Sequence, residues 1–256
     1  MNKRFFLLLL LFFLLIFQGD INKIYANQVR NIGEHKKDLE DNQVVTAMVH
    51  SDIWYENIFL LAKKFNSMAH KNFTIQVGLS GSSSVLQYNF PEWYNDKFSP
   101  DLFYEDLNKD ELKDIIVVLI SGSGTGLSTK DIHILHQKVD PYQRFEEVSV
   151  DPISSVVKRL VKFEKEGEMA IITIGKKTYK VDVSKFDYNP KTYFPKPFTG
   201  GVEEYRIEKG ILYGTTVVYI SPSGSIGELE IEYLWDGTKY SPNKIEFRPQ
   251  RPSPSE

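Results

Sequence analysis

The C-terminal half of the chain alternates apolar and polar residues in three successive pairs of segments. The first pair, 169–174 and 177–183, is joined by residues 175–177, and the later pairs are joined at 209–210 and 236–237. Alternation with a period of two predicts strands that bury one face, and short turns containing Gly predict antiparallel hairpins. The pattern therefore predicts three β-hairpins in this half.

Ahead of these hairpins the apolar spacing becomes helical. Asp151 suits the N-cap, Pro152 the first helical position and Gly167 the C-terminal end. The apolar positions between them are Ile153, Val156, Val157, Leu160 and Phe163. A sheet with one apolar face must be covered, so we expect this helix to cover the third hairpin. The apolar face of that hairpin carries Leu229, Ile231, Tyr233 and Trp235, and the other face carries Glu228, Glu230 and Glu232.

The N-terminal half, residues 43–148, contains a weak internal repeat. The apolar run 58–61 matches 115–118, and segment 73–77 matches 131–135, at offsets of 57 and 58 residues. The repeat predicts two copies of one strand-based unit. Residues 56–69 leave an alternative open, because their apolar positions also fit a helix. Those positions are Ile58, Leu61, Ala62, Phe65 and Met68.

The first residues have the layout of a secretory signal. Lys3 and Arg4 precede an unbroken apolar run, 5–17, and Ala26 offers a small residue for cleavage. The run is shorter than the roughly 20 apolar residues of a membrane-spanning helix. We therefore expect a cleaved signal peptide over residues 1–26 rather than an anchor. The protein is then secreted or associated with the cell envelope.

Charge and cysteine content narrow the class of protein. Removing the signal deletes three basic residues and one acidic residue, which takes the formal net charge from −3 to −5. A mildly acidic chain gives no electrostatic case for binding nucleic acid. The remaining sequence has no second long apolar run, so we expect no membrane attachment after cleavage. Cys is absent, which excludes disulfides, thiol catalysis and Cys-ligated zinc.

The ends of the chain differ in composition from its middle. Residues 27–42 are polar and charged, which is typical of a flexible leader. Residues 249–256 are rich in Pro and Ser, which predicts a disordered tail. Two folded units are expected between them: a β repeat domain over 43–148 and a domain of one helix with antiparallel hairpins over 149–248. The fold class is mainly β (α+β), with antiparallel sheets and one or two covering helices.

The most specific chemistry lies in the segment DLNKDELKD, residues 106–114. Its oxygen-bearing side chains alternate along a tight loop, where they can converge on one point. Calcium takes about six to eight oxygen ligands in loose geometry, and carboxylates so close together repel one another without a cation. The alternative is a solvated acidic turn. We predict a structural Ca2+ site formed by Asp106, Asn108, Asp110, the Leu112 carbonyl and Asp114.

This loop, with the apolar strand DIIVV after it, resembles the calcium loop of FG-GAP/VCBS-type repeats. The resemblance implies propeller-blade-like repeats in the N-terminal half, although known propellers contain more copies than this chain can supply. Glu111 stands where those loops usually have Gly, and the upstream copy keeps Asp52 but lacks the other acids. The chain also resembles uncharacterised exported proteins of Gram-positive bacteria that end in a hairpin like residues 226–247.

These observations favour a non-enzymatic exported module that binds a cell-envelope or extracellular partner. The alternatives are an exported hydrolase of envelope polysaccharide and a membrane-anchored extracellular sensor. The motifs G-x-S-x-G and HExxH do not occur. His133 and His136 should point to opposite faces of a strand and so cannot share a metal. Neighbouring acidic residues such as Glu203 and Glu204 should likewise face opposite ways.

Overall fold

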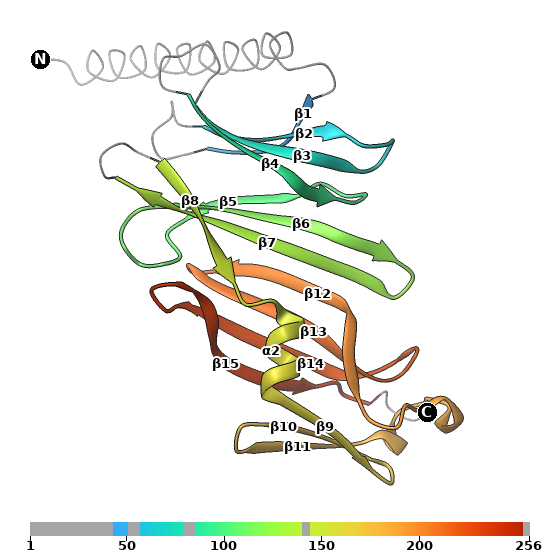
Figure 1. The fold of residues 1–256 in the computed structure, drawn as a ribbon. Helices are drawn as coiled ribbons and strands as arrows, with labels where there is room; N and C mark the ends of the chain where they lie inside the picture. Colours follow the sequence, from blue (N-terminus) through green and yellow to red (C-terminus); the bar gives the residue numbers. More distant parts are fainter. Residues whose placement is uncertain (1–42, 51–56, 79–84, 140–143, 253–256) are drawn as a thin grey trace, which may run out of the picture.

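The structure is a computed structural model that describes residues 43–50, 57–78, 85–139 and 144–252. The predicted signal peptide (1–26), the predicted leader (27–42), Asp52 and residues 253–256 of the predicted tail lie outside the described residues. The described part is mainly β, with largely antiparallel sheets and one α-helix (Figure 1), as the sequence predicts.

The N-terminal half forms two four-stranded antiparallel meanders, in which consecutive strands are neighbours. The first contains β1 (Gln43–Val49), β2 (Ile58–Lys64), β3 (His70–Val77) and β4 (Leu86–Asn95). The second contains β5 (Asp101–Glu105), β6 (Asp114–Gly124), β7 (Leu127–Lys138) and β8 (Arg144–Val150). The two sheets lie one above the other (Figure 1), and apolar side chains from both form one core.

The segment whose sequence allowed either a helix or a strand is the strand β2. It is an inner strand, buried without interruption from Ile58 to Ala62, and Ile58, Leu60 and Ala62 face the core shared with the second meander. A strand buried in this way is apolar at nearly every position, so it also contains a helical spacing. Ile58 opposes Val77, and at the predicted offsets Ile115 opposes Leu135. The described strands form no closed propeller, and the blade-like repeat stays a prediction.

Strands from both predicted domains join one eight-stranded sheet. Its order is β12-β13-β14-β15-β8-β7-β6-β5. Its C-terminal members are β12 (Phe198–Glu208), β13 (Ile211–Ser221), β14 (Gly224–Trp235) and β15 (Lys239–Pro249). β15 runs parallel to β8, and Val202 of β12 also pairs with Ser128 of β7, so the sheet curls back on itself. The predicted boundary between residues 148 and 149 falls within β8.

The three predicted hairpins are confirmed. β10 (Met169–Ile174) pairs with β11 (Lys177–Asp182), β12 with β13, and β14 with β15. Two short 3-10 helices, η1 (Val183–Lys185) and η2 (Pro190–Thr192), connect β11 to β12. The acidic face of the third hairpin differs from expectation, because Glu230 is buried between Arg206 and Arg248. The predicted tail also begins inside the sheet, since Gln250 N–H donates to the Ile226 carbonyl.

The helix is shorter than its sequence pattern predicts. α2 spans Ile153–Leu160, and the chain continues directly as strand β9 (Val161–Glu166). The prediction of a helix up to Gly167 is therefore wrong. Val161 and Phe163 are residue types that favour strands, and β9 pairs along its whole length with β10. Asp151 does not cap the helix either, because the N-cap position is Pro152 and no side chain bonds there.

Asp151 instead links α2 to the last strand. Its carboxylate lies 2.9 Å from Arg159 of the helix and 2.5 Å from Lys239 of β15. Bonds from Lys239 first, then from Arg159, hold the pKa of Asp151 below its usual value. The Asp151 carboxylate therefore binds a proton more readily in the unfolded chain than in the folded protein. The stabilisation is present above the unfolded pKa of about 3.9 and is lost as the pH falls through the folded-state pKa.

Asp151→Asn is expected to lower the free energy of unfolding by about 1 kcal/mol at pH 7, because both partners are partly exposed. In strong acid the two proteins should have equal stability. Urea unfolding followed between about pH 2 and 7 measures this difference. Asp187→Asn, at an exposed position, should leave the profile unchanged. A constant difference at every pH would contradict the ion-pair explanation.

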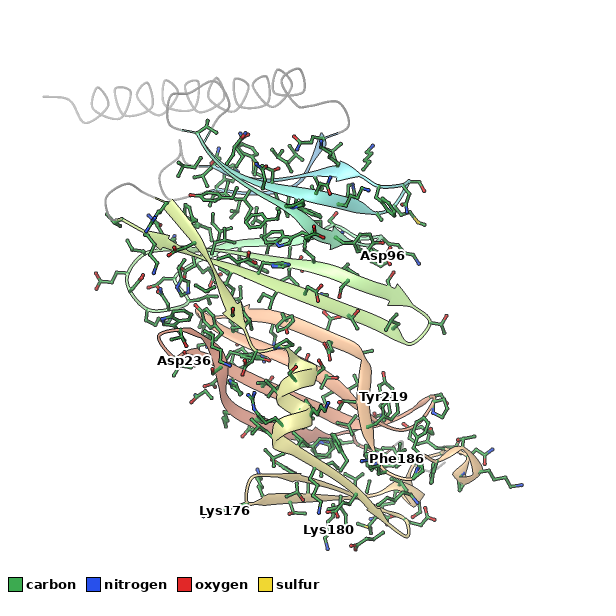
Figure 2. The ribbon with its side chains drawn as sticks, viewed as in Figure 1. Asp96, Lys176, Lys180, Phe186, Tyr219 and Asp236 are labelled. Carbon is green, nitrogen blue, oxygen red and sulfur yellow. The ribbon has the colours of Figure 1, made fainter. Side chains whose placement is uncertain are left out.

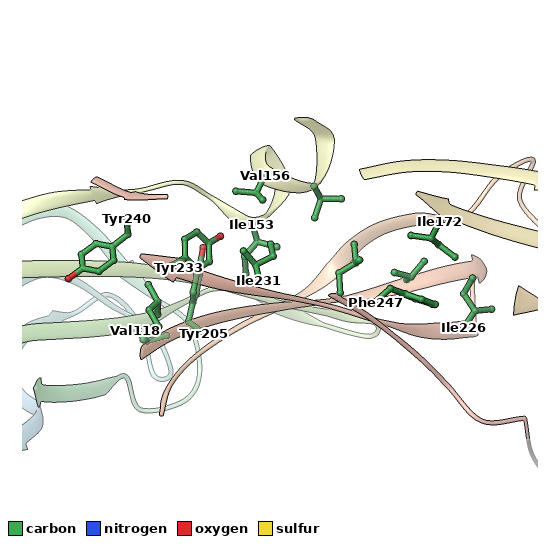
Figure 3. Close-up of a cluster of buried hydrophobic side chains, with 14 of the residues drawn as sticks. Val118, Ile153, Val156, Ile172, Tyr205, Ile226, Ile231, Tyr233, Tyr240 and Phe247 are labelled. Carbon is green, nitrogen blue, oxygen red and sulfur yellow. The ribbon is translucent and has the colours of Figure 1, made fainter. Parts of the chain in front are cut away.

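Two hydrophobic cores lie on opposite faces of β6. Ile115 and Val117 pack between the two meanders. Ile116 and Val118 face the larger core, whose central side chains are drawn in Figure 3. In that core the apolar side chains of α2 gather with the apolar face of the third hairpin, while the helix itself contacts β9 and the second hairpin, β12 and β13. The three-stranded sheet β9–β11 contributes further side chains such as Ile172. β6 is thus an inner strand covered on both faces.

Candidate calcium loop

The segment predicted to bind calcium is the loop of residues 106–113 between β5 and β6, with Asp114 as the first residue of β6. The side chain of Asp106 organises its first turn. Its Oδ1 accepts the N–H of Lys109 at 2.7 Å, and its Oδ2 accepts the N–H of Glu111 at 3.1 Å. One carboxylate therefore closes a turn of six residues, 106–111.

The next two side chains form local turns of the same kind. Asn108 Oδ1 accepts the Asp110 N–H at 3.0 Å, and Asp110 Oδ1 accepts the Leu112 N–H at 2.9 Å. The Asn108 amide donates to Asp110 Oδ2 at 2.9 Å. Lys109 and Glu111 have φ of 65° and 71°, a region that costs a non-Gly residue on the order of 1–3 kcal/mol. Glu111 thus adopts the backbone for which the resembling loops use Gly.

Asp114 lies beneath the loop and is fully buried. Its Oδ2 accepts the Leu107 N–H at 3.0 Å, and Oδ1 lies 3.4 Å from the Gln137 nitrogen. Burial above all, with a smaller contribution from the negative charge of Asp110, raises the pKa of Asp114 to about 7, against the lowering effect of the Leu107 and Gln137 N–H groups. A buried carboxylate is stable when its charge is compensated, and here backbone N–H groups do so in part.

Two residues that the sequence did not connect with the loop border it. His136 of β7 is fully buried, with Nε2 2.9 Å from the hydroxyl of Tyr240 on β15 and Nδ1 3.4 Å from the Asn108 amide. Burial lowers the pKa of His136 to about 4, so its ring is neutral at neutral pH. Burial, and next the charge of Asp114, raise the pKa of Tyr240. No local signal could have paired residues so distant in sequence.

The other His of β7 faces the opposite way, as predicted. The ring of His133 stacks on Trp93 at 3.8 Å between centroids, and Nδ1 lies 2.9 Å from Glu147. His133 therefore faces the first meander, whereas His136 faces the C-terminal strands. The two rings cannot share a metal.

The acidic pair at 203–204 is likewise split. Glu204 pairs with Lys130, whereas Glu203 lies along a groove of about 960 Å³ between β9 and β12. Burial, with a contribution from Asp131, raises the pKa of Glu203. Glu164 is the other carboxylate that lines this groove, and a hydrolase would need two such groups. It forms an ion pair with Lys162. Glu203 and Glu204 therefore have different surroundings, as the sequence predicts for neighbours on a strand.

The donor set of the loop suits calcium by chemical type, because carboxylate, amide and carbonyl oxygens are hard ligands. Asp114 adds a buried carboxyl group close to that of Asp110. However, Asp106 and Asp110 are turned towards loop N–H groups. In the described part of the chain, no three or more acidic or His side chains are gathered closely enough to hold a metal ion.

Within the described residues, no helix combines the length and the apolarity that a membrane crossing needs. In comparisons with protein-family models, curated proteins and solved structures, nothing matches this chain.

Proposed function

We propose that the protein is an exported, non-enzymatic β-rich module whose β5–β6 loop is stabilised by calcium. It binds a partner in the cell envelope or outside the cell. Export rests on the signal-like residues 1–26, and the non-enzymatic character rests on the lack of a catalytic motif in the sequence. The observation that carries the calcium proposal is the fully buried Asp114 carboxylate beneath an acidic loop.

The ligands would be the oxygens of Asp106, Asn108, Asp110 and Asp114 with the Leu112 carbonyl. Calcium would supply the positive charge that balances these carboxylates. The loop also packs on the turn between β12 and β13: a Cβ on Gly210 would lie 3.2 Å from the Asp106 carbonyl oxygen. Ordering the loop would therefore join the two halves of the chain, a role that disulfides fill in other exported proteins.

Calcium is expected to raise the melting temperature of the predicted mature chain, residues 27–256. A ligand present at 100 times its Kd stabilises the folded state by about 2.7 kcal/mol. For a chain of this size that corresponds to about 5–10 °C. Asp110→Ala and Asp114→Asn should abolish the calcium-dependent part of the shift. Thermal unfolding with calcium and with chelator measures both effects.

The turn at Asp236 provides a matched control. Its carboxylate accepts the N–H groups of Thr238 and Lys239, so Asp236→Ala breaks a similar turn outside the proposed site. This variant should melt earlier but keep the full response to calcium. Glu111→Gly should raise the melting temperature with and without calcium alike, because Gly adopts the observed positive φ without strain. Equal melting of the wild type with calcium and with chelator would remove the proposal.

A further inference from the structure

One end of the first meander exposes large apolar side chains. Phe65 and Met68, in the turn between β2 and β3, are 55% and 53% exposed. Phe98, in the loop after β4, is 66% exposed, and Tyr94 at the end of β4 is 37% exposed. The rings of Phe65 and Tyr94 are 6.3 Å apart. We call these four residues the apolar tip. Singly exposed apolar residues are ordinary, but a cluster indicates an interaction site.

The turn between β2 and β3 is held in place by hydrogen bonds. Asn66 Oδ1 accepts the N–H groups of Met68 and Ala69 at 2.8 and 2.7 Å. The Phe65 N–H donates to the Ala69 carbonyl at 2.9 Å. These hydrogen bonds hold the turn in a conformation that leaves Phe65 and Met68 exposed to solvent. The next residue, Ala69, is buried.

The loop after β4 is fixed by a buried amide. The Asn95 side chain donates to the carbonyls of Asp96 and Phe98 at 2.7 and 2.6 Å, and it accepts the N–H of Ile120 on β6. Asn95 opposes His70, the first residue of β3, so this loop lies beside the β2–β3 turn. Figure 2 marks Asp96 at this end of the sheet. Two ordered segments therefore present the apolar tip together.

Basic residues surround the apolar tip. Lys64, Lys71 and Lys97 are exposed, and none forms an ion pair with an acidic residue of the described ranges. The Lys71 ammonium lies 4.6 Å from the centre of the Phe65 ring. Two acidic residues lie close to them in the chain: Asp96, whose carboxylate accepts a bond from the Ser123 hydroxyl, and the exposed Glu92, two residues before Tyr94. The surroundings are thus cationic in a protein whose net charge is negative.

The N-terminal segment enters the fold at the same end. Gln43, the first residue of β1, opposes Lys63, two residues before Phe65. The 42 residues ahead of it contain the apolar run 5–17 and a polar stretch of 16 residues after the predicted cleavage point. The residues ahead of β1 therefore join the fold at the end that carries the apolar tip.

We propose that this end of the protein docks on the surface of a bilayer that contains anionic lipids. Aromatic and Met side chains would enter the headgroup region while the lysines contact lipid phosphates. The attachment is peripheral, and it goes beyond the proposed function by adding a membrane contact where the sequence led us to expect no membrane attachment after cleavage. The exposed lysines match the charge of lipid phosphates, and the adjoining aromatic and Met side chains suit the headgroup region, so together they favour a lipid surface as the occupant.

The test is flotation of residues 27–256 with vesicles of phosphatidylcholine containing about one third phosphatidylglycerol, in chelator so that calcium cannot bridge protein and lipid. Binding should be at least about tenfold stronger than to phosphatidylcholine alone. Phe65→Ser with Phe98→Ser should weaken it by about tenfold or more. Lys64→Gln with Lys97→Gln should weaken it by about fivefold per lysine and reduce its salt dependence.

Matched controls lie elsewhere on the molecule. Leu234 of β14 is 57% exposed, and Lys176 and Lys180 lie near the end of the molecule opposite the apolar tip (Figure 2). Leu234→Ser, and Lys176→Gln with Lys180→Gln, should bind vesicles as the wild type does. Lack of vesicle binding by the wild type, or an equal loss in the controls, would overturn the proposal. So would a dimer that dissociates in the Phe65→Ser, Phe98→Ser variant without any lipid effect.

Discussion

Phe73→Ala is expected to lower the free energy of unfolding by about 3–5 kcal/mol, because it empties a large volume in a closed core. Phe73 is 1% exposed on β3 and packs between the two meanders with Ile115 and Leu135. Its ring also contacts Trp93, at 6.4 Å between centroids. Urea or thermal unfolding measures the loss. Trp93 fluorescence should change as well, since its packing neighbour is removed.

Phe65→Ala on the same hairpin provides the control. Phe65 is exposed at the turn, so its removal should change stability by no more than about 0.5 kcal/mol. A small effect at Phe73 would mean that the first meander does not pack on the second as described. Equal effects at both positions would point to a general sensitivity of the hairpin rather than to a buried core.

Gly227→Ala is expected to lower the free energy of unfolding by about 2–4 kcal/mol, through overpacking and backbone strain. Gly227 lies in β14 with φ of 153°. A Cβ at this position would lie 2.4 Å from the Arg248 carbonyl oxygen and 2.6 Å from the Phe247 ring. The carbonyl belongs to the paired strand β15 and cannot move without breaking the ladder. Chemical denaturation of the purified variant measures the effect.

Gly237→Ala separates the two causes. Gly237 also has a positive φ, 98°, but a Cβ there would meet no atom within 4 Å. The Gly237→Ala variant should therefore lose only the stability that the strained positive φ costs, about 1 kcal/mol. If Gly227→Ala costs no more than Gly237→Ala, the close approach between β14 and β15 is not the reason for the Gly.

The predicted calcium loop shows how far local sequence can go. The alternation of Asp106, Asn108 and Asp110 predicts a tight loop before a buried strand, and that loop is present. Local turns of this kind depend on short-range bonds between side chain and backbone. The neighbours His136 and Tyr240 reach the loop from β7 and β15. Only the pairing of distant strands brings these residues close to the loop, so no sequence motif predicts that they lie there.

The region after α2 shows the limit of periodicity. Val161 and Phe163 continue the apolar side of the helix, yet they lie in β9. A short apolar spacing fits both a helix and a strand. Which of the two forms depends on whether a neighbouring strand is present to pair with the segment. Here β10 offers a full set of pairings, so the chain leaves the helix after Leu160.

The sequence by itself determined the hairpins, the mainly β class and the turn positions, because alternation and turn chemistry act over a few residues. The tertiary structure decided which strands of the two halves share a sheet, where α2 ends, and that Glu230 is buried between two arginines. It also gathered Phe65, Tyr94 and Phe98 at one end of the first meander. These features depend on contacts between residues far apart in the chain, and local sequence patterns do not predict such contacts.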